Sequence, residues 1–343
     1  MKKGILLLLL ASIVLSGSCA KQKPKPADHP KNRIFVGFSM GTLMEDRWIR
    51  DRDIFLSMAK QNGMEVIVNN ANRDSDLQYR QVMEMIHQGI DVLILAPNDC
   101  NSEVKCVRAA KDKGIPVISY DRLVRNADAD LYVSFDHFKV GKVMAQELLK
   151  KAPDGGYLIV NGPESDDNTR RIQDGAMSVL KRPMESGRIR ILEKTWAEGW
   201  TRENAYRFTS EQIRKNGRDI RAILCGNDSL AWGAIDALAE AQMIEQVAVS
   251  GQDADLVACQ RIANGEQTMT TYKPIQKLVE KTVESCLRLA AGQKVPGQGT
   301  MSDGTYEIPY VLIDVLPVTK ENMKETVIRD GFHLYEDIYQ AKE

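Results

Sequence analysis

The fold is decided by residues 91–122, which read DVLILAPNDCNSEVKCVRAAKDKGIPVISYDR. Val92–Ala96 and Pro116–Ser119 are short apolar runs rich in β-branched residues, which is typical of strands buried on both faces. Glu103–Lys113 has the length and spacing of an amphipathic helix, and Gly114 can adopt the left-handed conformation that ends one. The stretch is therefore predicted to form a strand, a helix and a second strand parallel to the first.

The same alternation extends in both directions along the chain. Strands are predicted at Ile34–Phe38, Glu65–Val68, Tyr157–Val160, Ile189–Glu193, Ala222–Cys225 and Val247–Ser250. Helices are predicted between them at Asp46–Asn62, Asp76–Gln88, Lys139–Lys151, Asn168–Lys181, Arg202–Asn216, Ser229–Glu240 and Leu256–Asn264, and Gly63 and Gly89 follow the first two. This rhythm predicts an α/β chain with two similar halves, each built on a parallel sheet. A late helix at Ile275–Ala291 and a strand-like run at Val311–Val315 predict a third passage between the halves, which makes the junction a hinge.

Composition and charge narrow the classes of protein and partner. A chain of 343 residues exceeds the usual size of one domain. Its 46 basic and 47 acidic residues are interspersed, so no nucleic-acid partner is expected. Cys100, Cys106, Cys225, Cys259 and Cys286 show no Cys-x-x-Cys spacing, which argues against a metal site or a disulfide framework.

The first residues have the pattern of an export signal. Lys2 and Lys3 precede an apolar run over residues 5–15 that is too short to span a bilayer. Small residues then lead into Cys19, as in a bacterial lipobox, so we expect a signal peptide over 1–18 and a lipid on Cys19. Residues 19–32 contain three prolines and suit an extended spacer. The alternative is ordinary signal-peptide cleavage beside an incidental cysteine.

Polar side chains follow the predicted strands, where a parallel sheet covered by helices places its ligands. They are Asp121-Arg122, Asp166 to Asn168, Asn227-Asp228 and Gln252-Asp253. Carboxylates accept hydrogen bonds from hydroxyl groups, Arg and Lys donate them and Asn does both, which suits a polyol. Trp48, Trp196 and Trp200 offer flat surfaces for the C–H faces of a sugar ring. Taken singly, a strand-end Asp is more often a helix cap, and Asp228 before Ser229 is interpreted as one, which leaves Asn227 freer to face the cleft.

Long collinear motifs carry a resemblance to a known family. They are Glu45-Asp46-Arg47-Trp48, Tyr120-Asp121-Arg122, Ser250-Gly251-Gln252-Asp253-Ala254-Asp255-Leu256, Tyr272-Lys273-Pro274 and Asp330-Gly331-Phe332-His333. With them the chain resembles the periplasmic D-xylose-binding proteins over nearly everything after the spacer. The resemblance implies a type I periplasmic binding protein fold, in which two Rossmann-like lobes with parallel sheets are joined by a three-strand hinge. The lobes are expected at 33–138 plus about 276–306, and at 139–275 plus about 307–343.

The resemblance also implies a site. Its sugar-holding residues fall on Arg47, Arg122, Asp166, Asn168, Asn227, Asp253 and Lys273, with Trp200 as a stacking aromatic and Trp48 as a second face. Asp121 is expected to orient Arg122. In the turn from Gly162 to Asn168 the chain keeps the acidic-Asn end of the family pattern but departs from it in the residues before that end. His137 stands where the family commonly has Asn. We interpret His137 as close to the hinge and not as a ligand contact.

The expected function is that of a monomeric receptor outside the cytoplasm, in the periplasm or on the cell surface, which carries a lipid anchor and needs no cofactor. It binds a monosaccharide such as D-xylose by hinged closure and delivers it to an ABC transporter permease. One alternative is an input protein for a chemoreceptor or a two-component kinase. Another is a sugar-processing enzyme, although the chain lacks Gly-x-Gly-x-x-Gly, P-loop, His-Glu-x-x-His and Gly-x-Ser-x-Gly patterns. A transcription regulator would need a DNA-reading module where this chain has its leader.

Overall fold

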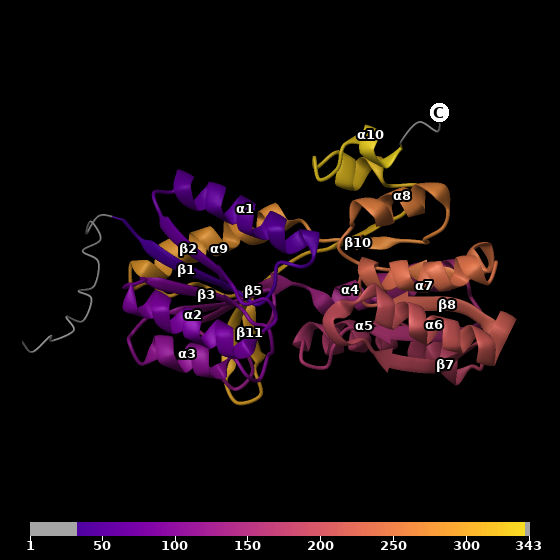
Figure 1. The fold of residues 1–343 in the computed structure, drawn as a ribbon, viewed down its shortest axis with the longest axis horizontal. Coiled ribbons are helices and arrows are strands. Elements are labelled where there is room, and N and C mark those ends of the chain that lie inside the picture. Colours follow the sequence, from indigo (N-terminus) through magenta and orange to yellow (C-terminus); the bar gives the residue numbers. More distant parts are fainter. Residues whose placement is uncertain (1–32, 340–343) are drawn as a thin grey trace, which may run out of the picture.

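A computed structural model describes residues 33–339, so the predicted signal peptide, Cys19 and most of the spacer lie outside the described residues. The larger sheet has seven strands in the order β11-β12-β5-β4-β3-β1-β2, all parallel except β11 (Figure 1). Its strands are β1 (Phe35–Met40), β2 (Glu65–Asn70), β3 (Val92–Ala96), β4 (Val117–Tyr120), β5 (Leu131–Phe135), β11 (Gly299–Ser302) and β12 (Glu307–Ile313). Helices α1 (Asp46–Gln61) and α9 (Ile275–Ala290) cover one face, and α2 (Ser75–His87) and α3 (Val104–Lys111) cover the other. We call this layered unit the first lobe.

The second lobe is built on a parallel four-stranded sheet in the order β7-β6-β8-β9. Its strands are β6 (Gly155–Asn161), β7 (Ile189–Trp196), β8 (Ile220–Cys225) and β9 (Ala248–Ser250). Helices α4 (His137–Lys151) and α5 (Asp167–Glu185) pack together on one face, and α6 (Arg202–Asn216) and α7 (Asp228–Glu240) pack together on the other. Helix α8 (Leu256–Asn264) packs against the C-terminal helix α10 (Tyr335–Ile338) at the edge of this lobe (Figure 1).

The chain passes between the lobes after β5, after β10 (Thr270–Tyr272) and after β12 (Figure 1). β10 pairs antiparallel with β13 (Leu316–Val318) in a small sheet of its own. The predicted boundary near residue 306 needs correction, because β12 pairs with β5 in the larger sheet as far as Ile313. A hairpin at Gly304, whose φ is 113°, folds β12 back against β11, and strand periodicity cannot say which sheet a strand joins.

Local signals account for most of the elements. Gly63, Gly89 and Gly114 have φ values of 72°, 82° and 72°, which confirms the left-handed conformation predicted at these positions. The inward face of α1 carries Phe55 and Ala59, both fully buried in the core of the first lobe.

The five cysteines among the described residues are free and buried. No helix within residues 33–339 combines the length and the apolarity needed to cross a bilayer.

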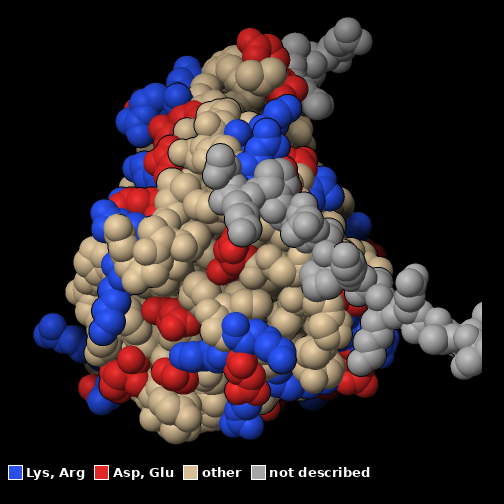
Figure 2. All heavy atoms as spheres, turned by 90° about the vertical axis from the view of Figure 1, so that its left-hand side faces the viewer, with Lys and Arg blue, Asp and Glu red and all other residues tan. Residues whose placement is uncertain are grey.

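The outer surface of the first lobe carries both signs of charge. Figure 2 shows Lys and Arg lying among Asp and Glu on this face, with uncharged residues between them. Surface ion pairs of this lobe include that of Lys111 with Asp128, 2.7 Å apart. The described part of this face therefore does not gather the basic stripe that nucleic-acid binding requires.

Candidate functional site

A small cavity lies between the lobes at the carboxyl ends of both sheets, and the free space in and around it, including the part open to solvent, is about 350 Å³. It is lined by Glu45, Arg47, Trp48, Asp121, Arg122, His137, Asp166, Asn168, Trp200, Asn227, Gln252, Asp253 and Lys273. All ten residues singled out as ligand contacts from the sequence thus line a single cavity, and Glu45, His137 and Gln252 join them. Trp196 is not among them and lies beside Arg170, whose guanidinium carbon is 5.6 Å from the ring centroid.

The wall from the first lobe is a network of buried charges around Arg47. Its Nη2 lies 2.8 Å from Asp121 Oδ2 and 3.1 Å from Asp51 Oδ2. Burial alone would lower the pKa of Arg47, but Asp121 and Asp51 outweigh it and raise that pKa. Burial would likewise raise the pKa of Asp121, but Arg47 and Lys273 together bring it well below its usual range. Both groups therefore stay charged, and Tyr120 donates to Asp51 to complete the network.

The indole of Trp48 supports both arginines of this wall. The guanidinium carbon of Arg47 lies 4.2 Å from its ring centroid, and that of Arg122 lies 5.1 Å away. Trp48 is only 3% exposed. Cation–π attraction to a buried ring fixes both donors in place, so Trp48 orients charged groups in addition to lining the cavity.

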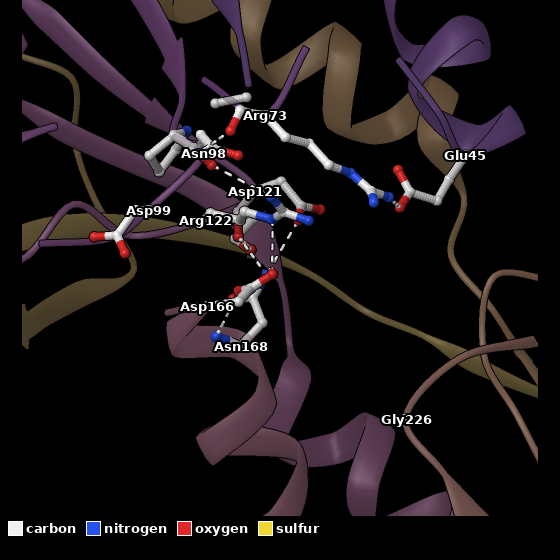
Figure 3. Close-up of polar contacts among 12 residues, drawn as sticks. Glu45, Arg73, Asn98, Asp99, Asp121, Arg122, Asp166, Asn168 and Gly226 are labelled. Atoms are coloured by element: carbon white, nitrogen blue, oxygen red, sulfur yellow. Dashed lines mark hydrogen bonds and ion pairs between the residues drawn. The ribbon is translucent and has the colours of Figure 1, made fainter. Parts of the chain in front are cut away.

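Residues of the two lobes meet directly across the cavity (Figure 3). Arg122 Nε, from the end of β4, lies 2.7 Å from Asp166 Oδ2 at the start of α5. Asn168 Nδ2 donates to both the carbonyl oxygen and Oδ1 of Asp121, each at 3.1 Å. Burial raises the pKa of Asp166, and Arg122 offsets part of that rise. These contacts connect the turn after β6, in the second lobe, to the turn after β4, in the first lobe.

Trp200 lies on a platform made by two glycines. A Cβ atom at Gly162, after β6, would lie 2.3 Å from the indole, and one at Gly226, after β8, would lie 2.9 Å from it. The chain reaches this position through left-handed residues, Gly199 with φ of 67° and Trp200 itself with φ of 58°. Among the described residues the buried Nε1 of Trp200 has no hydrogen-bond partner. One face of the indole is thus packed on backbone, and the side chain reaches the cavity.

The capping of α7 differs from the sequence interpretation. Asn227, and not Asp228, is the N-cap, because its Oδ1 accepts from Leu230 N at 2.9 Å. Asp228 is buried and accepts hydrogen bonds from Gln267, Thr270 and the backbone of Asp255. Asn227 therefore fulfils both roles that the sequence left separate, since it caps α7 and also lines the cavity. In the sequence, both residues of an Asn-Asp pair before a helix are good caps, so the choice depends on which one packs inside.

Asp253 and Lys273 form the hinge side of the cavity. Lys273 Nζ lies 2.6 Å from Asp253 Oδ1, and the two side chains are 4% and 8% exposed. Asp253 and Ala254 have φ values of 103° and 56°, a conformation that L-residues rarely adopt. Asp253 N donates to Thr271 O at 2.9 Å, which fixes this strained turn against β10. Strain held by surrounding structure is common at functional sites.

His137 lies close to the hinge, as the sequence interpretation has it, and it also lines the cavity. It is the first residue of α4 and is 2% exposed. Its position directly beyond a strand end is the same signal that identified the other polar residues. The periodicity did not predict β5, so this signal was absent from the sequence at His137.

The arrangement suits recognition of a neutral polar molecule. Three cations and four carboxylates line the cavity, and each carboxylate lies against a cation. The pairs are Arg47 with Asp121, Arg122 with Asp166, Lys273 with Asp253, and Glu45 with Arg73, which lies outside the lining. Such pairs leave further donor and acceptor positions free for hydroxyl groups. Within residues 33–339, no group of three or more His, Cys, Asp and Glu side chains is placed to hold a metal ion.

Known proteins are similar to this chain in sequence and in fold. The family model described as "Periplasmic binding protein domain" matches residues 36–294. The D-xylose-binding periplasmic protein of Haemophilus influenzae is 38% identical, over 98% of this chain and 99% of its own length. That of Escherichia coli K12 is also 38% identical, over 96% and 98%. A carbohydrate transporter solute-binding protein from Chloroflexus aurantiacus, solved in complex with D-glucose, superposes with a TM-score of 0.84 at 29% identity, over 89% of this chain and 98% of that one.

Proposed function

The chain belongs to the periplasmic binding protein family, and on that premise we propose that it is the sugar receptor of an ABC transporter, with D-xylose as its ligand. One observation carries the proposal most strongly: charged, amide and aromatic side chains from both lobes line one cavity at the strand ends. The two relatives named for D-xylose binding are similar over almost their whole length, which favours this sugar over others.

We propose that binding of the sugar drives hinged closure and that the sugar is later released without chemical change. Arg47 and Arg122 lie on the first lobe, whereas Asp166, Asn227 and Asp253 lie on the second, so only a closed molecule presents both sets to one sugar. A ligand shifts such an equilibrium only by binding one state more tightly than the other. Asp121, Asp166 and Asp253 are each paired with a cation, and the acceptor positions that the pair does not use are available to sugar hydroxyl groups.

Titration calorimetry of residues 33–343 against pentoses and hexoses tests the ligand. We expect D-xylose to bind more tightly than D-glucose, D-ribose or L-arabinose, and chromatography to recover the sugar intact. Small-angle scattering should show a smaller radius of gyration with D-xylose, because closure brings the lobes together. Absence of binding by every sugar at millimolar concentration, or recovery of a chemically altered sugar, would contradict the proposal.

We further propose that the receptor is a monomer, tethered outside the cytoplasm by a lipid on Cys19, where it supplies the permease. The small residues before Cys19 and the proline-containing spacer after it support this anchor. Labelling of cells with a radioactive fatty acid should mark the wild-type protein but not Cys19→Ala, which should leave the membrane fraction. Equal labelling of both proteins would rule out Cys19 as the site.

A further inference from the structure

His137 occupies a position in the cavity that neither the family pattern nor the other site residues explain. It begins α4 at the point where the chain first crosses from β5 into the second lobe. The side chain is 2% exposed and lines the cavity with Asp121, Lys273 and Arg47. It therefore lies at the hinge end of the cavity and belongs to the crossover itself.

The imidazole is buried without the hydrogen bonds that a buried ring normally makes. Neither Nδ1 nor Nε2 has a partner among the described residues. Buried polar atoms in native proteins are nearly always hydrogen-bonded, so two unpartnered nitrogens on one cavity-lining ring point to a molecule that enters the cavity. By contrast, the other described buried histidine, His333, has its Nε2 2.7 Å from the carbonyl oxygen of Ala254.

The surroundings keep this ring neutral. Burial lowers the pKa of His137 to about 3, and Lys273, Arg47 and Arg171 add to that effect against the opposing charge of Asp121. The positive end of the α4 dipole also disfavours a protonated ring at the first helical position. A neutral imidazole has one N–H donor and one bare nitrogen acceptor. A sugar hydroxyl group is likewise both a donor and an acceptor, so the two match.

We propose that His137 is a ligand-contacting residue that hydrogen-bonds a hydroxyl group of the sugar at the hinge end of the cavity. The inference rests on the proposed sugar-binding function and adds to it a residue outside the ten that were singled out from the sequence. Because the ring is part of the crossover between β5 and α4, a hydrogen bond to it also couples the sugar to the hinge.

Histidine-selective 15N NMR of the wild-type protein gives the first test and needs no variant. D-Xylose should shift both ring-nitrogen signals of His137, identified by their loss in His137→Ala, while the signals of the exposed His87 stay in place. Between pH 5 and 8 the His137 signals should keep the pattern of a neutral ring. The affinity for D-xylose should show no pH dependence that arises from this ring. His137 signals that do not move at saturating D-xylose would overturn the proposal.

A double-mutant cycle between protein and sugar gives the second test. His137→Ala should weaken D-xylose binding roughly three- to tenfold, which is the range expected for a neutral hydrogen bond. Among the monodeoxy analogues of D-xylose, the one lacking the contacted hydroxyl should bind wild type and His137→Ala equally well. His137→Asn, which restores the residue common in the family, should recover part of the lost affinity.

A matched control removes a buried, unpartnered polar group elsewhere. Thr209 in α6 is fully buried, and its hydroxyl has no partner among the described residues. Thr209→Val should leave the affinity for D-xylose unchanged. If every monodeoxy analogue loses the same factor in wild type and His137→Ala, the ring contacts no hydroxyl and this inference fails alone. If the wild type binds no sugar, the proposed function fails and this inference with it.

Discussion

Asp253→Ala is expected to weaken D-xylose binding by a factor of about 100 or more. The carboxylate is paired with Lys273 at 2.6 Å, and both side chains are almost completely buried. Removing one member of a buried pair leaves the other charge without compensation, at a cost of about 3–5 kcal/mol. The sugar also loses a charged acceptor, which contributes about 1.5–3 kcal/mol. Titration calorimetry with D-xylose measures the change, and thermal unfolding without sugar measures how much of it is a loss of stability.

Two further variants separate the role of the charge from general damage. Asp253→Asn keeps the size and an acceptor oxygen, so it should unfold closer to the wild-type temperature and still bind D-xylose poorly. Glu284→Ala removes the carboxylate of a surface pair with Lys281, 2.9 Å away, and surface pairs contribute about 0–1 kcal/mol. It should bind as the wild type does. Wild-type affinity in Asp253→Asn would show that the carboxylate charge is not needed by the ligand.

Strand and helix periodicity predicted most of the two sheets from the sequence. β3 has the predicted bounds Val92–Ala96, and α1 ends one residue before the predicted Asn62. β5 was missed because it follows β4 through a ten-residue loop instead of a helix, so it falls outside the strand–helix rhythm. β12 was predicted in part, as the strand-like run Val311–Val315, whereas β11 was missed because its four residues are mostly exposed and form no apolar run. The small β10–β13 sheet was missed because its pairing is long-range, which a local pattern does not contain.

The candidate site was predictable where a polar residue follows the end of a strand within three residues, as at Arg122 and Asp253. What the sequence did not contain was backbone conformation. Asp121 and Asp253 are left-handed at φ of 61° and 103°, although neither is glycine, and the surrounding hydrogen bonds impose this turn. The sequence also did not predict that Asn227 caps α7 while Asp228 is buried.

Gly175→Ala is expected to lower the free energy of unfolding by about 3 kcal/mol. In an α-helix, this substitution ordinarily stabilises a protein by about 0.5–1 kcal/mol, because alanine loses less conformational freedom on folding. In α5, however, the added Cβ would lie 1.9 Å from the carbonyl oxygen of Phe138, and backbone cannot move aside as a flexible side chain can. Overpacking of this kind costs about 1–3 kcal/mol or more, so the steric effect outweighs the helix propensity. Urea denaturation followed by circular dichroism measures the difference.

The same substitution connects helix packing to the cavity. Phe138 directly follows His137, and Asn168 lies in the first turn of α5, so separating α4 from α5 displaces both cavity-lining residues. Gly175→Ala should therefore also bind D-xylose more weakly than the wild type at a temperature where both are folded. Lys181→Ala is the control, because Lys181 lies on the exposed side of α5, away from the contact with α4. It should change neither the free energy of unfolding nor the affinity for D-xylose appreciably. A Gly175→Ala protein as stable as the wild type would mean that α4 and α5 do not approach as closely as this contact requires.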